Sequence, residues 1–440
     1  MSSLQIGATL FVAMLVLMSL RVPLSASMFI PGAVGYWLMA GESSLLNYLK
    51  GLAFARFSVY DLSVIPLFIM MGQFATQGGL SRALFKFANS LVGHFRGGMA
   101  MASIYACAAF GSVCGSSVAT AATLAHVALP EMRRHQYSGR LATATLAVGG
   151  TLGLLIPPSV ALVVYAILTE QNIAKLFLAA FVPGIIATLG YCLVIWLTVR
   201  LRPELAPPQP RHSFAERIES LVEVWPVAAV FAIVFGGIYT GIFTPTEGAA
   251  VGAAGTFFAA LLRNELNWKT FASCLFGTAE TTGMIFLIFL GADMLNGALA
   301  LSQMPTQLSD WVTGLEWSPL AIVACIIALY IVLGFFMDEL AAVILTIPVV
   351  FPAVMGLDLW GLAYSDKAIW FGILILMVMQ IGLVHPPVGL NIYIINSLAR
   401  DVPILDTFKG VIPFLASDFL RVILLFFFPS ICLWLVHVIA

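Results

Sequence analysis

Charge is scarce in this 440-residue sequence. Asp, Glu, Lys and Arg make up 9% of it, against roughly 25% in an ordinary soluble domain, whereas 61% of the residues are hydrophobic. Such a composition excludes a water-soluble domain, and we expect no nucleic-acid partner. Because a membrane span must satisfy its own backbone hydrogen bonds, the long apolar runs predict an all-α polytopic membrane protein in contact with membrane lipid.

Motifs of enzymes and metal proteins are also missing. The six cysteines contain no C-x-x-C pair, so neither a disulfide framework nor a metal site is indicated. No H-E-x-x-H helix and no nucleophile elbow occurs. An intramembrane hydrolase could pair Ser116 or Ser117 with His126 or His385, but nothing in the sequence positions such a pair. We therefore expect a protein that is not an enzyme and has no cofactor.

Apolar runs of the length of a membrane span, roughly 20 residues, predict ten spans. Two of these, 141–168 and 368–398, each contain a double proline. Two further runs, 97–131 and 318–355, are each interrupted by a short polar tip and predict re-entrant hairpins. The remaining spans are expected at 4–20, 22–40, 61–78, 173–199, 222–242, 247–262, 277–301 and 419–439.

The distribution of Lys and Arg orients these elements, because cations gather in cytoplasmic loops. With the N-terminus outside, only Lys50, Arg56, Lys175 and Lys367 of the 20 cations fall outside. Both termini are then periplasmic. The first hairpin is flanked by Arg96 and Arg133 and opens from the cytoplasm. The second is flanked by Glu316, Asp358 and Asp366 and opens from the other side.

The order of elements is duplicated along the chain. The stretch "FIPGAVGYWLMAG" (29–41) matches "FTPTEGAAVGAAG" (243–255), and hairpins, broken spans and the prolines Pro183 and Pro413 follow in register. Because the hairpins have opposite orientations, the sequence predicts an inverted repeat. A Pro- and Arg-rich linker, 200–221, joins the halves on the cytoplasmic side.

The double prolines mark the predicted binding site. A proline frees backbone carbonyls that hydrocarbon cannot satisfy, so two broken helices are tolerable only where they line a polar cavity. We expect one cation site where the first tip, with Gly115, Ser116, Ser117 and Thr120, meets the break at Pro157 and Pro158. Its counterpart should lie where the second tip meets the second break, and it is expected to contain Pro386, Pro387, Gly389 and Asn391.

Hydroxyls, amide oxygens and freed carbonyls are hard, neutral ligands that suit an alkali cation. Sodium is the first choice for the coupling ion, with substrate between the two sites. The residues expected to contact substrate are Ser117, His385 and Asn391.

Four stretches resemble a known family: "FGSVCGSSVATAATLAHVALPEM", "GTLGLLIPPSVALVVYAIL", "TPTEGAA" and "IGLVHPPVGLNIYII". They are similar to the large membrane (M) subunit of tripartite ATP-independent periplasmic (TRAP) transporters. The resemblance implies an elevator-type secondary transporter in the bacterial inner membrane that imports a small organic acid anion, usually with sodium. It also implies two partners, a periplasmic solute-binding protein and a small membrane subunit of a few helices.

The same resemblance adds Asp338 to the cation-binding residues and divides the chain into domains. It implies scaffold segments at 1–95 and 222–316, and transport-domain segments at 96–199 and 317–440. Two positions depart from the family pattern: Gln380, where many relatives have glutamate, and His385, where threonine is common.

Several alternatives stay open at this point. An ion or anion channel is one, and a proton-coupled carrier without a binding protein is another. Asp338 could serve only as a helix cap. Asp293, deep in its span, has no assigned role, and Asp418 with Arg421 is expected to form an interfacial ion pair.

Overall fold

The computed structural model describes residues 3–314 and 317–439, so Glu316 and the outer domain limits at 1, 316 and 440 lie outside the described residues. Within these ranges every regular element is helical. The helices are α1 (Ser3–Ser19), α2 (Leu24–Ala40), α3 (Glu42–Phe57), η1 (Tyr60–Ser63), α4 (Val64–Gln77), α5 (Leu80–Val92), α6 (Gly98–Cys114), α7 (Ser117–Arg134), α8 (Gly139–Leu155), α9 (Val160–Thr169), α10 (Ile173–Leu201), η2 (Pro203–Leu205), α11 (Phe214–Tyr239), α12 (Pro245–Leu262), α13 (Trp268–Leu301), α14 (Met304–Gly314), α15 (Pro319–Phe336), α16 (Glu339–Met355), α17 (Tyr364–Val384), α18 (Leu390–Leu398), α19 (Ile404–Phe427) and α20 (Ser430–Ile439).

The two halves present their helices in the same order. Each has two leading helices, a long element, a short helix, a helical hairpin, an interrupted helix and a long helix with an internal proline. The short helices α5 and α14, which precede the hairpins, were not predicted. The long element is bent by 60° between α3 and α4 in the first half, and in the second half it is the 34-residue helix α13.

Six helical segments of the described chain are long and apolar enough to cross a membrane, or seven if α3 with α4 is counted as one. Other predicted spans, such as α1 and α2, are helices of 17 residues. One predicted span boundary was wrong. The span placed at 419–439 covers the end of α19, which begins at Ile404 and ends at Phe427, and the separate helix α20.

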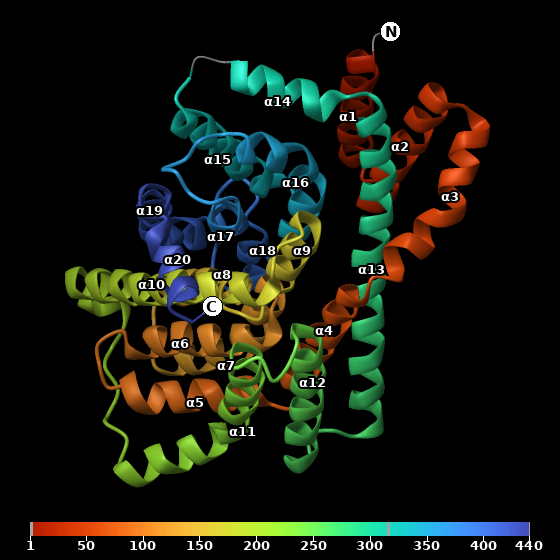
Figure 1. Cartoon of the computed structure of the whole chain (residues 1–440). Helices are drawn as coiled ribbons and strands as arrows, with labels where there is room; N and C mark the ends of the chain where they lie inside the picture. Colours follow the sequence, from red (N-terminus) through yellow and green to blue (C-terminus); the bar gives the residue numbers. More distant parts are fainter. Residues whose placement is uncertain (1–2, 315–316, 440) are drawn as a thin grey trace.

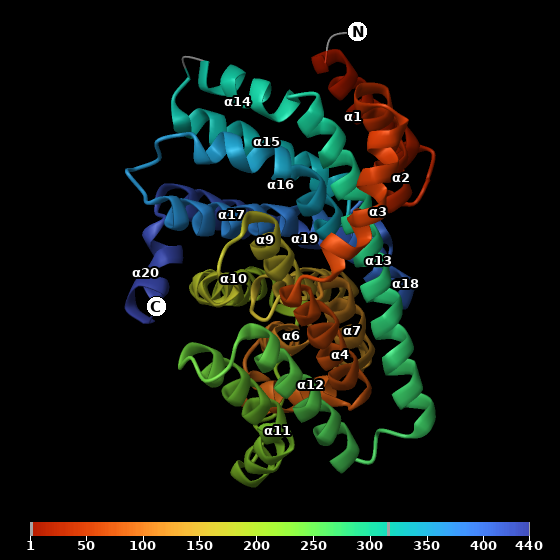
Figure 2. The same ribbon diagram turned by 45° about the vertical axis from the view of Figure 1, so that its right-hand side comes forward.

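Helices from different halves make the most extensive contacts: α2 packs against α13, and α12 packs against α4. Glycine permits the close approach. A methyl group on Gly32 of α2 would lie 2.6 Å from the Leu295 nitrogen of α13, and one on Gly291 would lie 2.4 Å from the Ser25 carbonyl. In both views α13 forms a long column along one side of the molecule (Figure 1, Figure 2).

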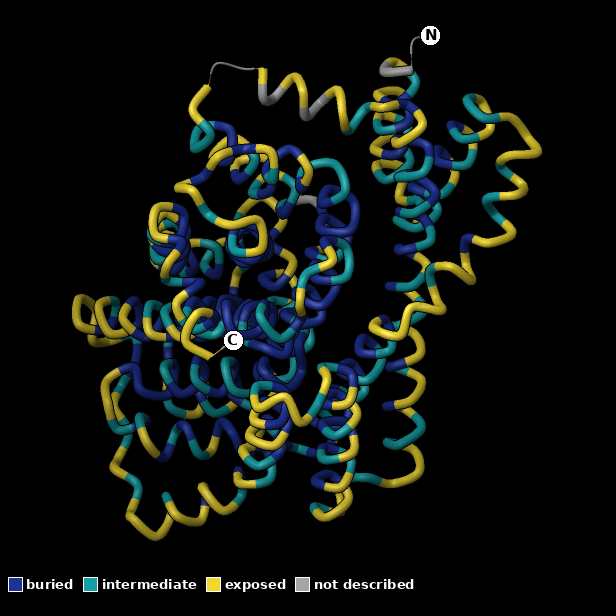
Figure 3. The backbone as a smooth tube through the Cα atoms, viewed as in Figure 1, coloured by how far each residue is buried: buried dark blue, intermediate teal, exposed yellow. Residues whose placement is uncertain are grey.

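The centre of the molecule is built around the two interrupted helices. From Leu141 to Leu155 every residue of α8 is buried, and so is every residue of α17 from Lys367 to Val384. The buried backbone is concentrated there, while the outer helices carry the exposed positions (Figure 3). An all-buried, nearly all-apolar helix belongs in the interior of a bundle, and these two helices carry the breaks into that interior.

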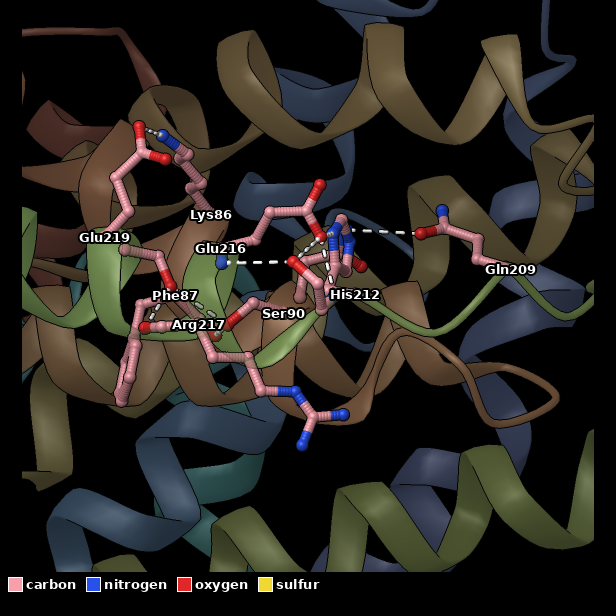
Figure 4. A network of polar contacts seen from close by, with 11 residues as sticks. Lys86, Phe87, Ser90, Gln209, His212, Glu216, Arg217 and Glu219 are labelled. Atoms are coloured by element: carbon pink, nitrogen blue, oxygen red, sulfur yellow. Dashed lines mark hydrogen bonds and ion pairs between the residues drawn. The ribbon is translucent and has the colours of Figure 1, made fainter.

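Within the predicted linker, 200–221, α10 continues to Leu201 and α11 begins at Phe214. Polar contacts attach the start of α11 to α5 (Figure 4). The Ser90 and Ser220 hydroxyls are 3.0 Å apart, and Lys86 donates to Glu223 at 2.5 Å. The hydrogen bond from Lys86 to Glu223 raises the pKa of Lys86 above its ordinary value.

Asp293, whose role the sequence left open, is paired in the structure. Its carboxylate accepts two hydrogen bonds from the Arg56 guanidinium, one of them from Nε at 2.5 Å. The Tyr48 hydroxyl donates to the Asp293 carbonyl at 3.2 Å. Both partners of Asp293 come from α3, so these contacts fasten α3 to the middle of α13.

Candidate functional site

The first hairpin tip is only two residues long. Gly115 ends α6 in the left-handed conformation, with φ +65°, and its N–H donates to the Gly111 carbonyl at 2.8 Å. Glycine adopts this conformation without steric cost. Ser116 then caps α7, its hydroxyl accepting from the Ala119 N–H at 3.4 Å. The sharp reversal therefore leaves the positive N-terminal end of α7 at the tip.

This tip touches the first helix break, as expected. Helix α8 ends at Leu155, Pro157 and Pro158 follow, and Ser159 caps α9 by accepting from Leu162 N–H at 3.4 Å. A methyl group on Gly115 would lie 3.1 Å from the Pro158 carbonyl oxygen. Both prolines are buried.

Matched glycine contacts hold each hairpin against its interrupted helix. A methyl group on Gly111 of α6 would lie 2.5 Å from the Gly153 Cα of α8, and one on Gly382 of α17 would lie 2.4 Å from the Gly334 carbonyl carbon of α15. Gly111 and Gly334 each lie four residues before their tip residue, Gly115 or Asp338. Gly153 and Gly382 likewise precede their double prolines by four residues. The two halves therefore repeat the same backbone contact.

Asn391 was expected beside the second tip, and its side chain lies at the first. Its amide Nδ2 donates to the Ser117 hydroxyl at 2.8 Å and to the Ala147 carbonyl at 3.1 Å. The reason is a crossed arrangement, in which α18 packs against α7 and α9 packs against α16. The helix after each break thus contacts the hairpin of the other half.

Unpartnered oxygen atoms occur on the three helices that meet at this contact, α18, α7 and α8. Among the described residues, Asn391 Oδ1, Thr120 Oγ1 and Thr145 Oγ1 are buried and have no hydrogen-bond partner. Thr120 lies against α8, because a methyl group on Gly153 would come within 2.7 Å of its hydroxyl. Buried polar atoms are nearly always satisfied, so a set of free oxygens indicates a bound species. Neutral amide and hydroxyl oxygens can coordinate an alkali cation.

The second tip and break are more open than the first. Asp338 is exposed and caps α16, its carboxylate accepting from the Leu340 N–H at 3.2 Å. Pro386 and Pro387 are exposed, while Gly389 is buried and has φ +62°. The His385 ring stacks on Phe335, with ring centres 4.7 Å apart. The tip and break therefore meet here too, but through aromatic rings.

A cavity of about 130 Å³, lined by apolar and polar side chains, lies between the two tips, α4 and α13. Ser116 and Ala119 line it from the first hairpin, and Glu339 and Leu340 from the second. Its other polar side chains are Gln73, Thr76 and Thr281. Glu339 was missed by the sequence analysis, which singled out only its neighbour Asp338. No local sequence signal marks Glu339, because the two hairpins meet α4 and α13 only in the folded structure.

A larger cavity, of about 690 Å³, lies between α5, α6, α10 and α11. Its lining is almost entirely apolar, with residues such as Phe87, Phe181 and Phe231. A cavity of this kind offers no groups to bind an organic anion.

A second buried polar cluster lies next to the breaks and was not predicted as such. Arg421 Nη2 donates to Asp418 at 2.7 Å and to the Gln380 amide oxygen at 3.3 Å. Gln380 Nε2 donates to the Thr151 carbonyl at 2.8 Å. The Asp418 and Arg421 side chains are 1% and 3% exposed, so the expectation of an interfacial pair was wrong.

The cluster joins equivalent positions of the two halves. Thr151 and Gln380 each lie six residues before a double proline, and Tyr191 and Arg421 each lie eight residues after the internal prolines Pro183 and Pro413. The Arg421 guanidinium lies 5.5 Å from the centre of the Tyr191 ring. The pair is buried because it lies on the face of α19 that packs on α8, α10 and α17.

Comparison with known proteins places these features in a family. The family model "Tripartite ATP-independent periplasmic transporter, DctM component" matches residues 11–431. The chain is 35% identical to the C4-dicarboxylate TRAP transporter large permease protein DctM of Pseudomonas aeruginosa, over 85% of this chain and 86% of that one. It is 28% identical to the ectoine TRAP transporter large permease protein TeaC of Halomonas elongata, over 97% of this chain and 98% of that one.

A solved structure shares the fold. The structure of the YdaH transporter from Alcanivorax borkumensis superimposes with a TM-score of 0.65 over 88% of this chain and 89% of that one. Sequence identity is 13%, so the likeness concerns the fold alone.

Proposed function

We propose a function from the premise that this chain belongs to the DctM family, the large permease component of TRAP transporters. The chain is accordingly a multi-pass membrane permease and not an enzyme. The family implies that it works with a small membrane subunit and a periplasmic solute-binding protein. What it carries, and how transport is coupled, are the subject of the proposal.

The proposed activity is sodium-coupled import of a small organic acid anion across the inner membrane. The presence of buried, unpartnered oxygens on the helices that meet at the Asn391–Ser117 hydrogen bond supports it most directly. A sodium ion bound between these helices would satisfy Asn391 Oδ1, with the Thr120 hydroxyl, three residues after Ser117 on α7, as a further ligand. Gly115, Ser116, Pro157 and Pro158 belong to the tip and break that enclose this first site.

A second sodium site is proposed at the other tip and break, with Asp338, Pro386, Pro387 and Gly389. Asn391 is assigned to the first site because its side chain reaches Ser117. Substrate is proposed to lie in the cavity between the tips, near Ser117, with His385 at its open side. The half-helix N-terminus at Ser116 would favour its carboxylate.

Movement is proposed to follow an elevator mechanism with inverted repeats. The hairpins, interrupted helices and long helices α10 and α19 would form the moving body, at 96–199 and 317–440. The rest, at 1–95 and 222–316, would form the scaffold, and both termini would be periplasmic. The buried first break and exposed second break support this, since an alternating carrier exposes one side at a time.

The test is uptake by proteoliposomes that contain this chain, its small subunit and its binding protein. Labelled organic acids are supplied with an inward sodium gradient, with a proton gradient alone, or with neither. Uptake that needs the sodium gradient is the expected result. Uptake driven equally by the proton gradient alone would reject sodium coupling, and ion current without solute would indicate the channel alternative.

A further inference from the structure

The cavity between the tips has an unusual charge balance. Of its described lining residues, Glu339 is the one with an ionisable side chain other than the thiol of Cys114, and none is Lys, Arg or His. Asp338, adjacent in sequence, adds a second carboxylate to the same tip. A cavity built only for a doubly negative substrate would be expected to present cations rather than carboxylates.

Glu339 is buried without full satisfaction of its carboxylate. The residue is 5% exposed, and its Oε2 atom has no hydrogen-bond partner. As the first residue of α16 it benefits from the positive end of that helix. A helix end does not replace a direct partner, however, and buried carboxylates are normally paired with a cation. The free oxygen is therefore available to a positively charged group that enters the cavity.

The wall of the cavity formed by the first hairpin favours an anion. Ser116 lines the cavity and caps α7, so the first amides of that helix lie at this wall. Backbone N–H groups at a helix N-terminus bind carboxylates. Gln73, Thr76 and Thr281 supply further neutral hydrogen-bonding groups from α4 and α13. One wall thus suits a carboxylate and the other suits a cation.

We infer that the substrate of this cavity is a zwitterion, a small organic acid that also carries a positively charged nitrogen, and that Glu339 binds that nitrogen. This inference rests on the proposed function, because it names the substrate class of the same site. Glu339 is then the residue that determines specificity. A dicarboxylate of the same length would bring its second carboxylate towards Glu339, where like charges repel.

The experiment uses two probes of equal chain length, 4-aminobutanoate and succinate. Each has a carboxylate at one end, and they differ in the charge at the other end. The chain with its small subunit is placed in lipid nanodiscs. Apparent dissociation constants come from the shift in thermal unfolding midpoint during titration, in sodium chloride and in choline chloride.

In sodium, the wild-type protein should bind 4-aminobutanoate at least tenfold more tightly than succinate. Glu339→Gln, which keeps the side-chain shape, should weaken 4-aminobutanoate binding at least tenfold and leave succinate binding equal or tighter. Glu339→Asp should keep the preference for 4-aminobutanoate. Glu247→Gln, at the exposed first turn of α12 and outside the cavity lining, is the matched control and should change neither constant.

The contrary results are distinct. Sodium-dependent binding in which the wild-type protein prefers succinate overturns the inference and leaves the proposed function standing. If Glu339→Gln weakens both probes equally by raising the sodium requirement, Glu339 is an ion ligand and the inference is also overturned. Binding of either probe that is indifferent to sodium, or no binding at all, rejects the proposed function together with the inference.

Discussion

Asn391 and Ser117 are 274 residues apart in sequence, yet the amide of one donates to the hydroxyl of the other at 2.8 Å. The contact joins the helix after the second break to the tip of the first hairpin. It ties a candidate ion site to both halves of the chain, so an ion bound there would stabilise one arrangement of the two halves relative to each other. Binding at such a shared site can be coupled to a rearrangement between the halves.

Asn391→Ala should weaken sodium binding without abolishing folding. It removes the amide oxygen that has no protein partner and the hydrogen bond to Ser117. We expect the sodium concentration for half-maximal uptake to rise about tenfold, equivalent to ~1.4 kcal/mol. The measurement is the sodium dependence of uptake in proteoliposomes.

The control for this variant is Asn396→Ala, on the same helix. Asn396 Nδ2 donates to the Val402 carbonyl at 2.7 Å and contacts no site residue through that bond. Its loss should lower stability slightly and leave the sodium dependence alone. Equal sodium dependence in wild type and Asn391→Ala would remove Asn391 from the site.

The paired glycines should tolerate no side chain. Gly111→Ala would place a methyl group 2.5 Å from the Gly153 Cα, and Gly382→Ala would place one 2.4 Å from the Gly334 carbonyl carbon. The hairpin would have to move away from the interrupted helix, which should cost about 1–3 kcal/mol. Thermal unfolding of the purified protein should show a lower midpoint for both variants.

Gly283→Ala is the matched control, because nothing lies within 4 Å of a methyl group at Gly283 inside α13. Alanine is the better helix former by about 1 kcal/mol. The control should therefore be neutral or slightly stabilising. A midpoint for Gly111→Ala or Gly382→Ala at or above that of the control would contradict the close glycine contacts.

The sequence located the helix breaks well because proline has a direct local effect. Pro157–Pro158 and Pro386–Pro387 remove backbone donors and end α8 and α17 nearby. The residues of the first tip could also be predicted from the sequence. Gly115 is typical of the end of a helix, and Ser116, directly after it, is typical of the N-cap of the next helix. These signals depend only on a few neighbouring residues.

Signals that depend on tertiary packing were misread. Asp406, Lys409, Asp418 and Arg421 made α19 look too polar to be a span, although its packing buries the last two. The correspondence between Pro413 and Pro183 in the two halves could have located α19, because Pro183 lies inside the equivalent helix α10. Asn391 was assigned to the wrong tip because no local pattern reveals that α18 crosses to α7. Helices α5 and α14 are too short and too polar for a hydropathy search.

The pairing of Arg56 with Asp293 predicts that the two are energetically coupled. Their side chains are 22% and 15% exposed, so removal of one partner leaves a partly buried charge. Asp293→Asn or Arg56→Gln alone should cost about 1–3 kcal/mol of stability. The double variant should lose less than the sum of the two, which a double-mutant cycle of thermal or chemical unfolding measures. Strict additivity would show that the ion pair contributes nothing.

The buried cluster around Arg421 offers a charge-relocation test. Asp418→Asn leaves Arg421 without a counter-charge in the centre of the bundle, and loss of one partner of a buried pair costs about 3–5 kcal/mol. Gln380 lies on the other side of the guanidinium, with its amide oxygen 3.3 Å from Arg421 Nη2. Gln380→Glu would therefore put a carboxylate within reach of the same cation. It would also remove the donor to the Thr151 carbonyl, a loss of about 1–3 kcal/mol.

Because the first cost exceeds the second, Asp418→Asn combined with Gln380→Glu should be more stable than Asp418→Asn alone and less stable than wild type. The measurement is the midpoint of thermal unfolding of the wild type, of each single variant and of the double variant. Rescue would show that charge balance at Arg421, rather than the shape of Asp418, is what the centre of the bundle requires. If the double variant is the least stable of the four, the introduced carboxylate does not reach the guanidinium, and the hydrogen bond between Gln380 and Thr151 is the contact that joins the two halves.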